Sequence, residues 1–244
     1  DAEYEFVAID GQYNYKITGN IGSVRYLGLT FNAGQGNTPR RQFAYLSDQT
    51  LELDQDGNFT LILSQEAIDI PGQWVQIPDD ASGILVRQYI AVREKEELPT
   101  LSIEVLGSPI QYKPVTDQEI ANAIIGTSYA FLSLTTLYHR VLPELMEKTN
   151  VFIEATSDTL GGAITGNDNL YMIGSYQLED DEVLIMRVQP PNTRYWNIAL
   201  ESRWHETADY LHRPRSLTLD EVEYSADGSV EFVVAHQDPG QPNW

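Results

Sequence analysis

The chain has 244 residues, of which 42% are apolar and 10% aromatic, a composition typical of a globular protein with a core of its own. It has no cysteine, which excludes disulfides and thiolate chemistry. Thirty-six acidic against fifteen basic residues give a net charge of −21, a surface that repels nucleic acid and anionic membranes. We therefore expect neither partner, and no stretch reaches the roughly 18 apolar residues of a membrane helix.

Alternating apolar and polar residues predict strands in the first part of the chain. Residues 3–9 and 12–18 are expected to form a hairpin around Asp10-Gly11, because this dipeptide tolerates the positive φ of tight turns. A second hairpin is expected around Asp56-Gly57, a long loop over 32–48, and a sheet centre at 83–92, where the apolar run is nearly continuous. The other expected strands cover 24–31, 50–54, 58–64 and 100–106.

One helix is expected after these strands. Thr116 and Glu119 form the capping box that satisfies the free amides of a helix start. Apolar residues at three- and four-residue spacing then predict a helix over 117–140, with a short continuation from Pro143 through Met146. Strands are expected again at 150–155, 169–177 and 183–188, with a loop over 156–168.

Part of the sequence occurs twice at a nearly constant offset. The repeated features are an Arg-Tyr dipeptide, an Asp-Gly turn and a Trp after Pro-Gly-Gln, at offsets of 169, 171 and 170. They are Arg25-Tyr26 and Arg194-Tyr195, Asp56-Gly57 and Asp227-Gly228, and Trp74 and Trp244. Such an offset predicts an internal duplication.

The expected fold is mainly β, with two related antiparallel β-sandwich or jelly-roll-like repeats joined by a helical segment. The expected domains are residues 1–114, a helical connector over 115–150, and residues 151–244. A strand follows Trp74, but no residues follow Trp244. We expect the second repeat to lack its last strand, so that the chain continues or another chain pairs with the open edge.

The second half contains a series of aromatic-rich motifs. They are Tyr195-Trp196-Asn197, Arg203-Trp204, Asp209-Tyr210, Arg215-Ser216-Leu217, Asp227-Gly228 and His236 to Trp244. In these motifs the chain resembles the DUF1214 family, whose members are bacterial β-rich proteins of undefined role, sometimes joined to a DUF1254 domain. The resemblance is densest over 171–244, and residues 15–19, 74 and 86–89 resemble the upstream part of such proteins. The resemblance implies a fold and no catalytic residues. It leaves the compartment open between bacterial cytoplasm, periplasm and secretion.

His236 and Asp238 are the candidate catalytic residues. They follow a predicted strand and enter a Pro/Gly-rich loop, a place where functional residues often collect. His236 would act as a general base oriented by Asp238. The alternative is a loop held only by Asp-Pro and Asn-Trp turns.

The candidate ligand-binding residues are cationic and aromatic, a combination that suits an anion and an apolar ring face. They are Arg87, Tyr89, Arg203, Trp204 and Tyr210. The alternative is a scaffold of core aromatics, because Arg25-Tyr26 repeats Arg194-Tyr195. No metal or cofactor is expected: His139, His205 and His212 lack metal-ligand spacing, and the calcium-like run from Asp54 reaches Gln65 at its twelfth position.

Two functional hypotheses follow. The first is an enzyme, or an enzyme component, acting on a small, largely apolar molecule in a cleft between the repeats. The second is a non-catalytic ligand-binding or assembly module, as a homo-oligomer or by strand pairing at the edge after Trp244. Convergence of His236, Arg203 and Arg87 on one concave pocket would favour the enzyme.

Overall fold

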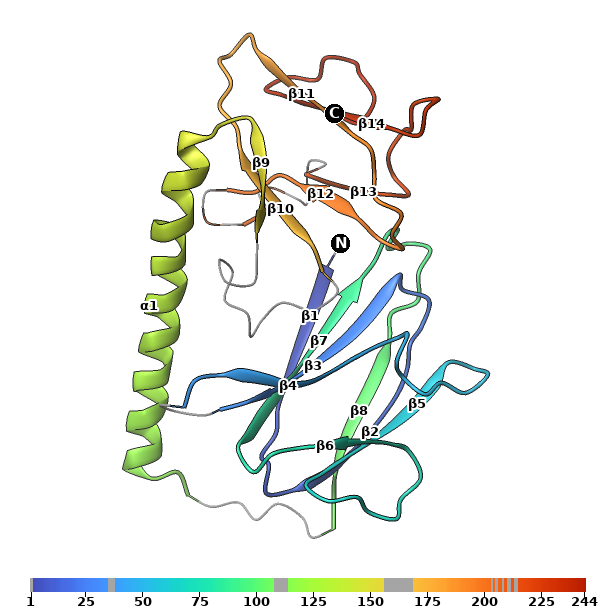
Figure 1. The fold of residues 1–244 in the computed structure, drawn as a ribbon, viewed down its shortest axis with the longest axis vertical. Coiled ribbons are helices and arrows are strands. Elements are labelled where there is room, and N and C mark those ends of the chain that lie inside the picture. Colours follow the sequence, from blue (N-terminus) through green and yellow to red (C-terminus); the bar gives the residue numbers. More distant parts are fainter. Residues whose placement is uncertain are drawn as a thin grey trace.

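The computed structural model of the chain describes residues 2–34, 38–107, 114–155, 169–202, 204, 206, 207, 209, 212 and 215–244. These residues form β-strands and one helix, with the strands in several small sheets (Figure 1). The predicted mainly-β fold is confirmed. The division into domains at 114 and 150 stays a prediction.

The first half is a sandwich of two four-stranded sheets, and the core lies between them. One sheet has the order β1 (Ala2–Ala8), β7 (Ala81–Tyr89), β3 (Tyr26–Ala33), β4 (Arg41–Ser47). The other has the order β6 (Gln73–Gln76), β5 (Asn58–Ser64), β2 (Asn14–Asn20), β8 (Thr100–Leu106). All neighbours are antiparallel except β5 and β6, which are parallel. Buried side chains from both sheets meet in one cluster, including Ile17, Leu29, Phe31, Leu61 and Ile84.

The predicted first hairpin is wrong, because its two strands lie in different sheets. β1 pairs with β7, where Phe6 is opposite Leu85, whereas β2 pairs with β5 and β8. The Asp10-Gly11 turn does form, with Tyr13 N–H donating to the Asp10 carbonyl at 3.0 Å. It carries the chain from one sheet to the other. Alternation shows which side chains share a face of a strand, but it does not identify the neighbouring strand.

In the first half, the predicted loop over 32–48 is partly wrong, whereas the predicted turn and sheet centre are confirmed. The predicted loop over 32–48 contains β4, whose residues are mostly half-buried on both faces and therefore show no clean alternation. The turn at Asp56-Gly57 is confirmed, with Gly57 at a φ of 80° and its N–H 3.2 Å from the Asp54 carbonyl. The predicted sheet centre at 83–92 is confirmed by β7, which lies between β1 and β3.

The helix is continuous, as α1 (Asp117–Glu147), with Pro143 inside it. The predicted capping box is confirmed: Glu119 N–H donates to Thr116 Oγ1 at 3.2 Å, and Thr116 N–H donates to Glu119 Oε2 at 2.7 Å. Figure 1 shows α1 along one side of the molecule, from the level of the first-half sheets to that of β9. Among the described residues, no helix has the length and apolar character that crossing a membrane requires.

The second half holds three two-stranded antiparallel sheets in the residues described. β9 (Val151–Ala155) pairs with β10 (Tyr171–Ser175), and β11 (Val183–Val188) with β14 (Val230–Ala235). β12 (Asn197–Ala199) pairs with β13 (Ser216–Thr218). A small buried cluster of Val222, Val230 and Phe232 lies among them. The predicted loop over 156–168 lies outside the described residues.

Candidate functional site

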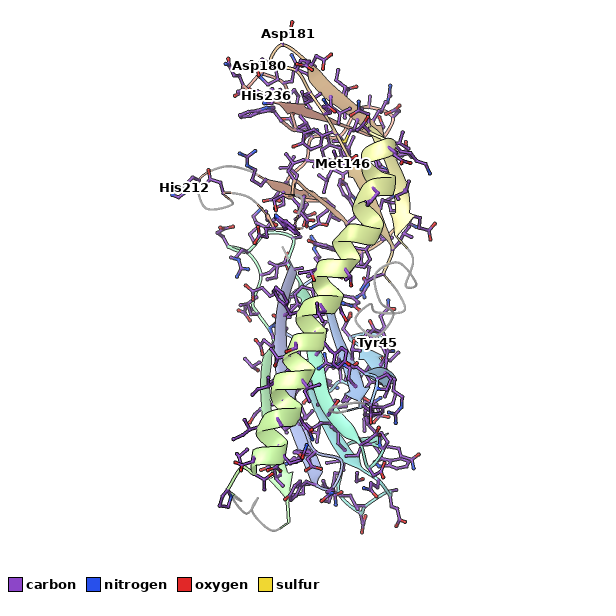
Figure 2. The ribbon with its side chains drawn as sticks, turned by 90° about the vertical axis from the view of Figure 1, so that its left-hand side faces the viewer. Tyr45, Met146, Asp180, Asp181, His212 and His236 are labelled. Carbon is purple, nitrogen blue, oxygen red and sulfur yellow. The ribbon has the colours of Figure 1, made fainter. Side chains whose placement is uncertain are left out.

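The predicted catalytic pair makes separate contacts. His236 follows β14 and is exposed, and its Nε2 lies 3.4 Å from the Leu178 carbonyl. Asp238 accepts the Gly240 N–H at 2.7 Å, a contact that closes its own turn. Among the described residues no hydrogen bond joins the two. Figure 2 shows His236 at the same end of the molecule as Asp180 and Asp181, far from Tyr45 in the first half.

The predicted ligand-binding residues are only partly placed. Arg203 and Tyr210 lie outside the described residues, as does His205. Trp204 is exposed, and its N–H donates to Ser202 Oγ at 3.1 Å. Of this set, the structure brings Arg87 and Tyr89 together, at the end of β7. Convergence of His236, Arg203 and Arg87 on one pocket, which would favour the enzyme, stays untested because Arg203 lies outside the described residues.

Arg87 lies inside a group of tyrosines and only 2% of its surface is exposed. Its guanidinium carbon is 5.4 Å from the centre of the Tyr4 ring, a cation–π geometry. Burial opposes the charge, but the nearby hydroxyls of Tyr89, Tyr171 and Tyr4 leave the pKa of Arg87 above its ordinary value. Because the group is so deeply buried, an anion from solvent cannot reach it without movement of the surrounding side chains.

Tyr89 lies in a stack of three rings that joins the two halves of the chain. Its ring centre is 4.8 Å from that of Tyr26 in the first half and 4.8 Å from that of Tyr195 in the second. Its hydroxyl is 3.5 Å from the hydroxyl of Tyr171, and Tyr26 and Tyr45 share a hydrogen bond. The stack fixes the start of β10 and the approach to β12 against the end of β7.

Burial keeps the phenols of this stack neutral. Desolvation, followed by the neighbouring Tyr171, raises the pKa of Tyr89 far above its usual value. Desolvation, with the carboxylates of Glu221 and Glu96 nearby, likewise raises the pKa of Tyr195. These hydroxyls therefore remain protonated at neutral pH and cannot act as bases, so the arrangement suits packing better than proton transfer.

Two ion pairs near the stack link the halves, and each half supplies the arginine of one pair and the aspartate of the other. Arg25 of the first half pairs with Asp220 of the second, and Arg194 of the second half pairs with Asp48 of the first. Arg25 and Arg194 are the two arginines of the repeated Arg-Tyr dipeptide. A buried hydrogen bond of 2.8 Å, from Thr218 Oγ1 to the Ala91 carbonyl, lies in the same region.

The sequence contains one signal for this stack, the repeated Arg-Tyr dipeptide. Tyr26 and Tyr195 are the tyrosines of the repeated Arg-Tyr dipeptide, and repetition favoured a scaffold over a ligand site. Their geometry is compatible with that alternative. Nothing in the sequence indicated that Tyr89 would lie between them or that Tyr171 would reach it, because these contacts join residues more than 60 positions apart.

A small, partly open cavity lies in the first half, and none of the predicted site residues lines it. It measures about 160 Å³ and lies between the two sheets, where β1 and β7 face β8. Its lining is mostly apolar, with Phe6, Ile84 and Ile103 among its members, and Glu5 and Ser102 at its polar positions. Within the described part of the chain, no group of three His, Asp or Glu side chains could hold a metal ion.

The proteins that are similar to this chain share its fold, and their descriptions state no activity. The model of the family described as "Protein of unknown function (DUF1214)" matches residues 150–244, which confirms the predicted resemblance over the second half. The crystal structure of an uncharacterized protein from Burkholderia cenocepacia is 26% identical with a TM-score of 0.84, covering 100% of this chain and 68% of that chain.

A second solved structure shares the fold alone. The VPA0106 protein from Vibrio parahaemolyticus is 13% identical with a TM-score of 0.55, covering 99% of this chain and 79% of that chain. No curated protein matches the sequence significantly. These findings support the fold, and they transfer no substrate, reaction or partner.

Proposed function

We propose that this chain, whose second half matches DUF1214, is a non-catalytic assembly module that associates with a second copy of itself through α1. The observation that carries the proposal is the exposure of apolar side chains on this helix. Ile124 is 62% exposed and Phe131 67% exposed. In the described structure the helix packs mainly on β10, and its described large apolar side chains between residues 120 and 132 are exposed.

The helix is apolar on more than one side. At 100° per residue, Ile124 and Phe131 share a face, whereas Ile125, Tyr129 and Leu132 lie about 80–140° further round the helix. All five are exposed. A helix that is apolar around most of its circumference is typical of a buried position, and large exposed apolar patches mark interaction sites.

Charge favours a second copy as the partner. From residue 120 to residue 138 the sequence contains no Asp, Glu, Lys, Arg or His, although the chain carries a net charge of −21. Two copies of so acidic a protein repel one another over most of their surface. They meet with least repulsion where the surface is uncharged, and α1 provides such a region.

The enzyme hypothesis has less support. His236 and Asp238 each bond to backbone, and the stacked phenols remain protonated at neutral pH. It stays a prediction that rests on His236. If the chain is an assembly module, His236→Ala leaves the association unchanged.

Sedimentation velocity from about 1 to 100 µM tests the proposal, a range in which a specific dimer of micromolar affinity changes its population. We expect the wild type to associate as its concentration rises. Ile124→Glu with Phe131→Glu places two carboxylates on the apolar face and should weaken association at least about tenfold, or 1.4 kcal/mol.

The matched control is Gln118→Glu with Asn122→Asp. These two residues are exposed, and the substitutions add the same two charges to the same helix at polar positions. We expect near-wild-type association. A protein that remains monomeric at the highest concentration, or a control that dissociates as much as the apolar-face variant, would contradict the proposal.

A further inference from the structure

The cavity of the first half begins at one side of the sandwich. β1 is an edge strand of one sheet and β8 an edge strand of the other, and both contribute to the lining. The remaining lining residues come from β2, β3 and β7, which lie further inside the two sheets. The cavity therefore extends from the two strand edges into the space between the sheets.

The lining changes from apolar to polar with depth. The inner part consists of the buried side chains Ile17, Leu29, Ile84 and Val86. Around them lie the half-buried side chains Val7, Leu101 and Ile103. The polar members of the lining, Glu5 and Ser102, are both exposed. A molecule that matches this gradient is apolar over most of its length and polar at one end.

The volume limits the size of such a molecule. At about 160 Å³ the cavity is close to the size, about 150 Å³, of an apolar protein cavity that takes up one benzene ring. Well-packed cores leave few spaces larger than one water molecule. Water gains little in the inner part, because a buried water needs several polar partners. This part of the cavity therefore suits an apolar group of about six carbon atoms.

Glu5 indicates the charge of the polar end. The other acidic residues on the two edge strands have cationic partners, since Glu3 pairs with Arg93 and Glu104 pairs with Lys16. In the described part of the chain Glu5 has no such partner. A positively charged group at the mouth of the cavity would supply one.

Gln88 adds an acceptor beside this carboxylate. Its side chain is buried, and its Nε2 donates to Glu5 Oε1 at 3.4 Å. Its amide oxygen, Oε1, is also buried and accepts no hydrogen bond from the residues that the structure describes. A buried acceptor without a donor is unfavourable, so a ligand that donates to it gains a hydrogen bond that the empty site lacks.

We infer that this cavity binds a small primary amine with an apolar body of about six carbon atoms. The body packs against the buried inner side chains, and the ammonium group donates to the Glu5 carboxylate and to Gln88 Oε1. An anionic head group is repelled by Glu5 and by the net charge of −21. The site is independent of the α1 surface proposed for self-association.

Three probes with the same number of carbon atoms test the head group: hexylamine, hexan-1-ol and hexanoate. Each is titrated into the whole chain, and binding is followed by NMR. We expect hexylamine to bind saturably with a dissociation constant of about 1 mM or lower. Hexan-1-ol should bind at least about fivefold more weakly, and hexanoate more weakly still.

Two variants and a control test the location. Glu5→Gln keeps the shape of the side chain and removes its charge, so hexylamine should lose most of its advantage over hexan-1-ol. The control Glu104→Gln removes the same charge from an exposed residue of β8 outside the lining, and should leave both affinities unchanged. Val7→Phe fills part of the cavity and should weaken both ligands at least about fivefold, with circular dichroism used to verify its fold.

Any of four results would overturn the inference. The first is no saturable binding of hexylamine, and the second is binding of hexan-1-ol or hexanoate as tight as that of hexylamine. The third is an equal loss in Glu104→Gln and Glu5→Gln, because the amine would then respond to net charge and not to this site. The fourth is wild-type binding of hexylamine by folded Val7→Phe. If Val7→Phe does not fold, the comparison of Glu5→Gln with Glu104→Gln decides.

Discussion

At the scale of single residues, the tyrosines between the halves make stability sensitive to alkaline pH. Burial raises the pKa of Tyr89 and of Tyr195, so the folded protein retains protons that the unfolded chain releases near pH 10. The stabilisation is complete below pH 10 and is lost as the pH rises through the raised pKa values. The loss is at most about 1.4 kcal/mol per pH unit for each group.

We therefore expect the free energy of unfolding in urea to be lower at pH 11 than at pH 8. The double variant Tyr89→Phe with Tyr195→Phe keeps both rings and removes both titrating hydroxyls, so its loss over this interval should be smaller. An equal loss in variant and wild type would show that other groups cause it.

Only some of the site residues that the sequence groups together lie together in the structure. The Pro/Gly-rich loop after a strand predicts that His236 and Asp238 act as a pair. The directions in which the two side chains point depend on the turn, and here each makes its hydrogen bond elsewhere. Arg87 and Tyr89 were placed in one set and do lie together. Their neighbours Tyr4, Tyr26 and Tyr195 come from three other segments, and such contacts require the fold to be known.

At the scale of elements, the two Asp-Gly turns provide a matched comparison. Gly57 and Gly228 both hold a φ of 80°, which a side chain makes unfavourable. We expect Gly57→Ala and Gly228→Ala each to lower the free energy of unfolding by about 1 kcal/mol in urea titrations. Gly126→Ala, in the interior of α1 with nothing within 4 Å of the added carbon, should instead stabilise by up to about 1 kcal/mol. Destabilisation by all three would contradict the conformational explanation.

The start of α1 gives a second prediction. Thr116→Ala removes the hydroxyl that accepts the Glu119 N–H and should destabilise the helix by about 1 kcal/mol, seen as a smaller circular dichroism signal at 222 nm. Thr127→Ala makes the same substitution at an exposed position inside the helix, and there the better helix propensity of Ala should leave the signal equal or larger. Equal losses in both variants would rule out capping as the cause.

Elements were easier to predict than their pairing. The positions of β2, β7, β8 and β11 follow from runs of apolar or alternating residues, and the helix start follows from Thr116 and Glu119. The partner of β1 does not, because the Asp10-Gly11 turn has the residues of a hairpin but leads into the second sheet. β4 was missed because both of its faces are half-buried, which removes the alternation that identifies a strand.

At the scale of the whole molecule, two reciprocal ion pairs connect the halves. We expect a double-mutant cycle of Arg194→Ala and Asp48→Ala to give a coupling of about 0.5–1 kcal/mol in urea unfolding, falling in 0.5 M NaCl as screening increases. Lys16 and Glu104, 3.5 Å apart within the first half and with Glu104 61% exposed at its side chain, are the control and should show coupling near zero. Coupling that does not change with salt would exclude a mainly electrostatic link.

The pairing of β1 with β7 affects how the protein is made. Ala2 lies opposite Tyr89, so β1 leaves the ribosome roughly 4–17 s before its partner strand β7 is complete, at ordinary elongation rates. During that interval the aromatic rings of Tyr4 and Phe6 have no sheet to join. The first sandwich can close only once β7 has emerged, and a nascent chain stalled before residue 81 is the species that most needs a chaperone.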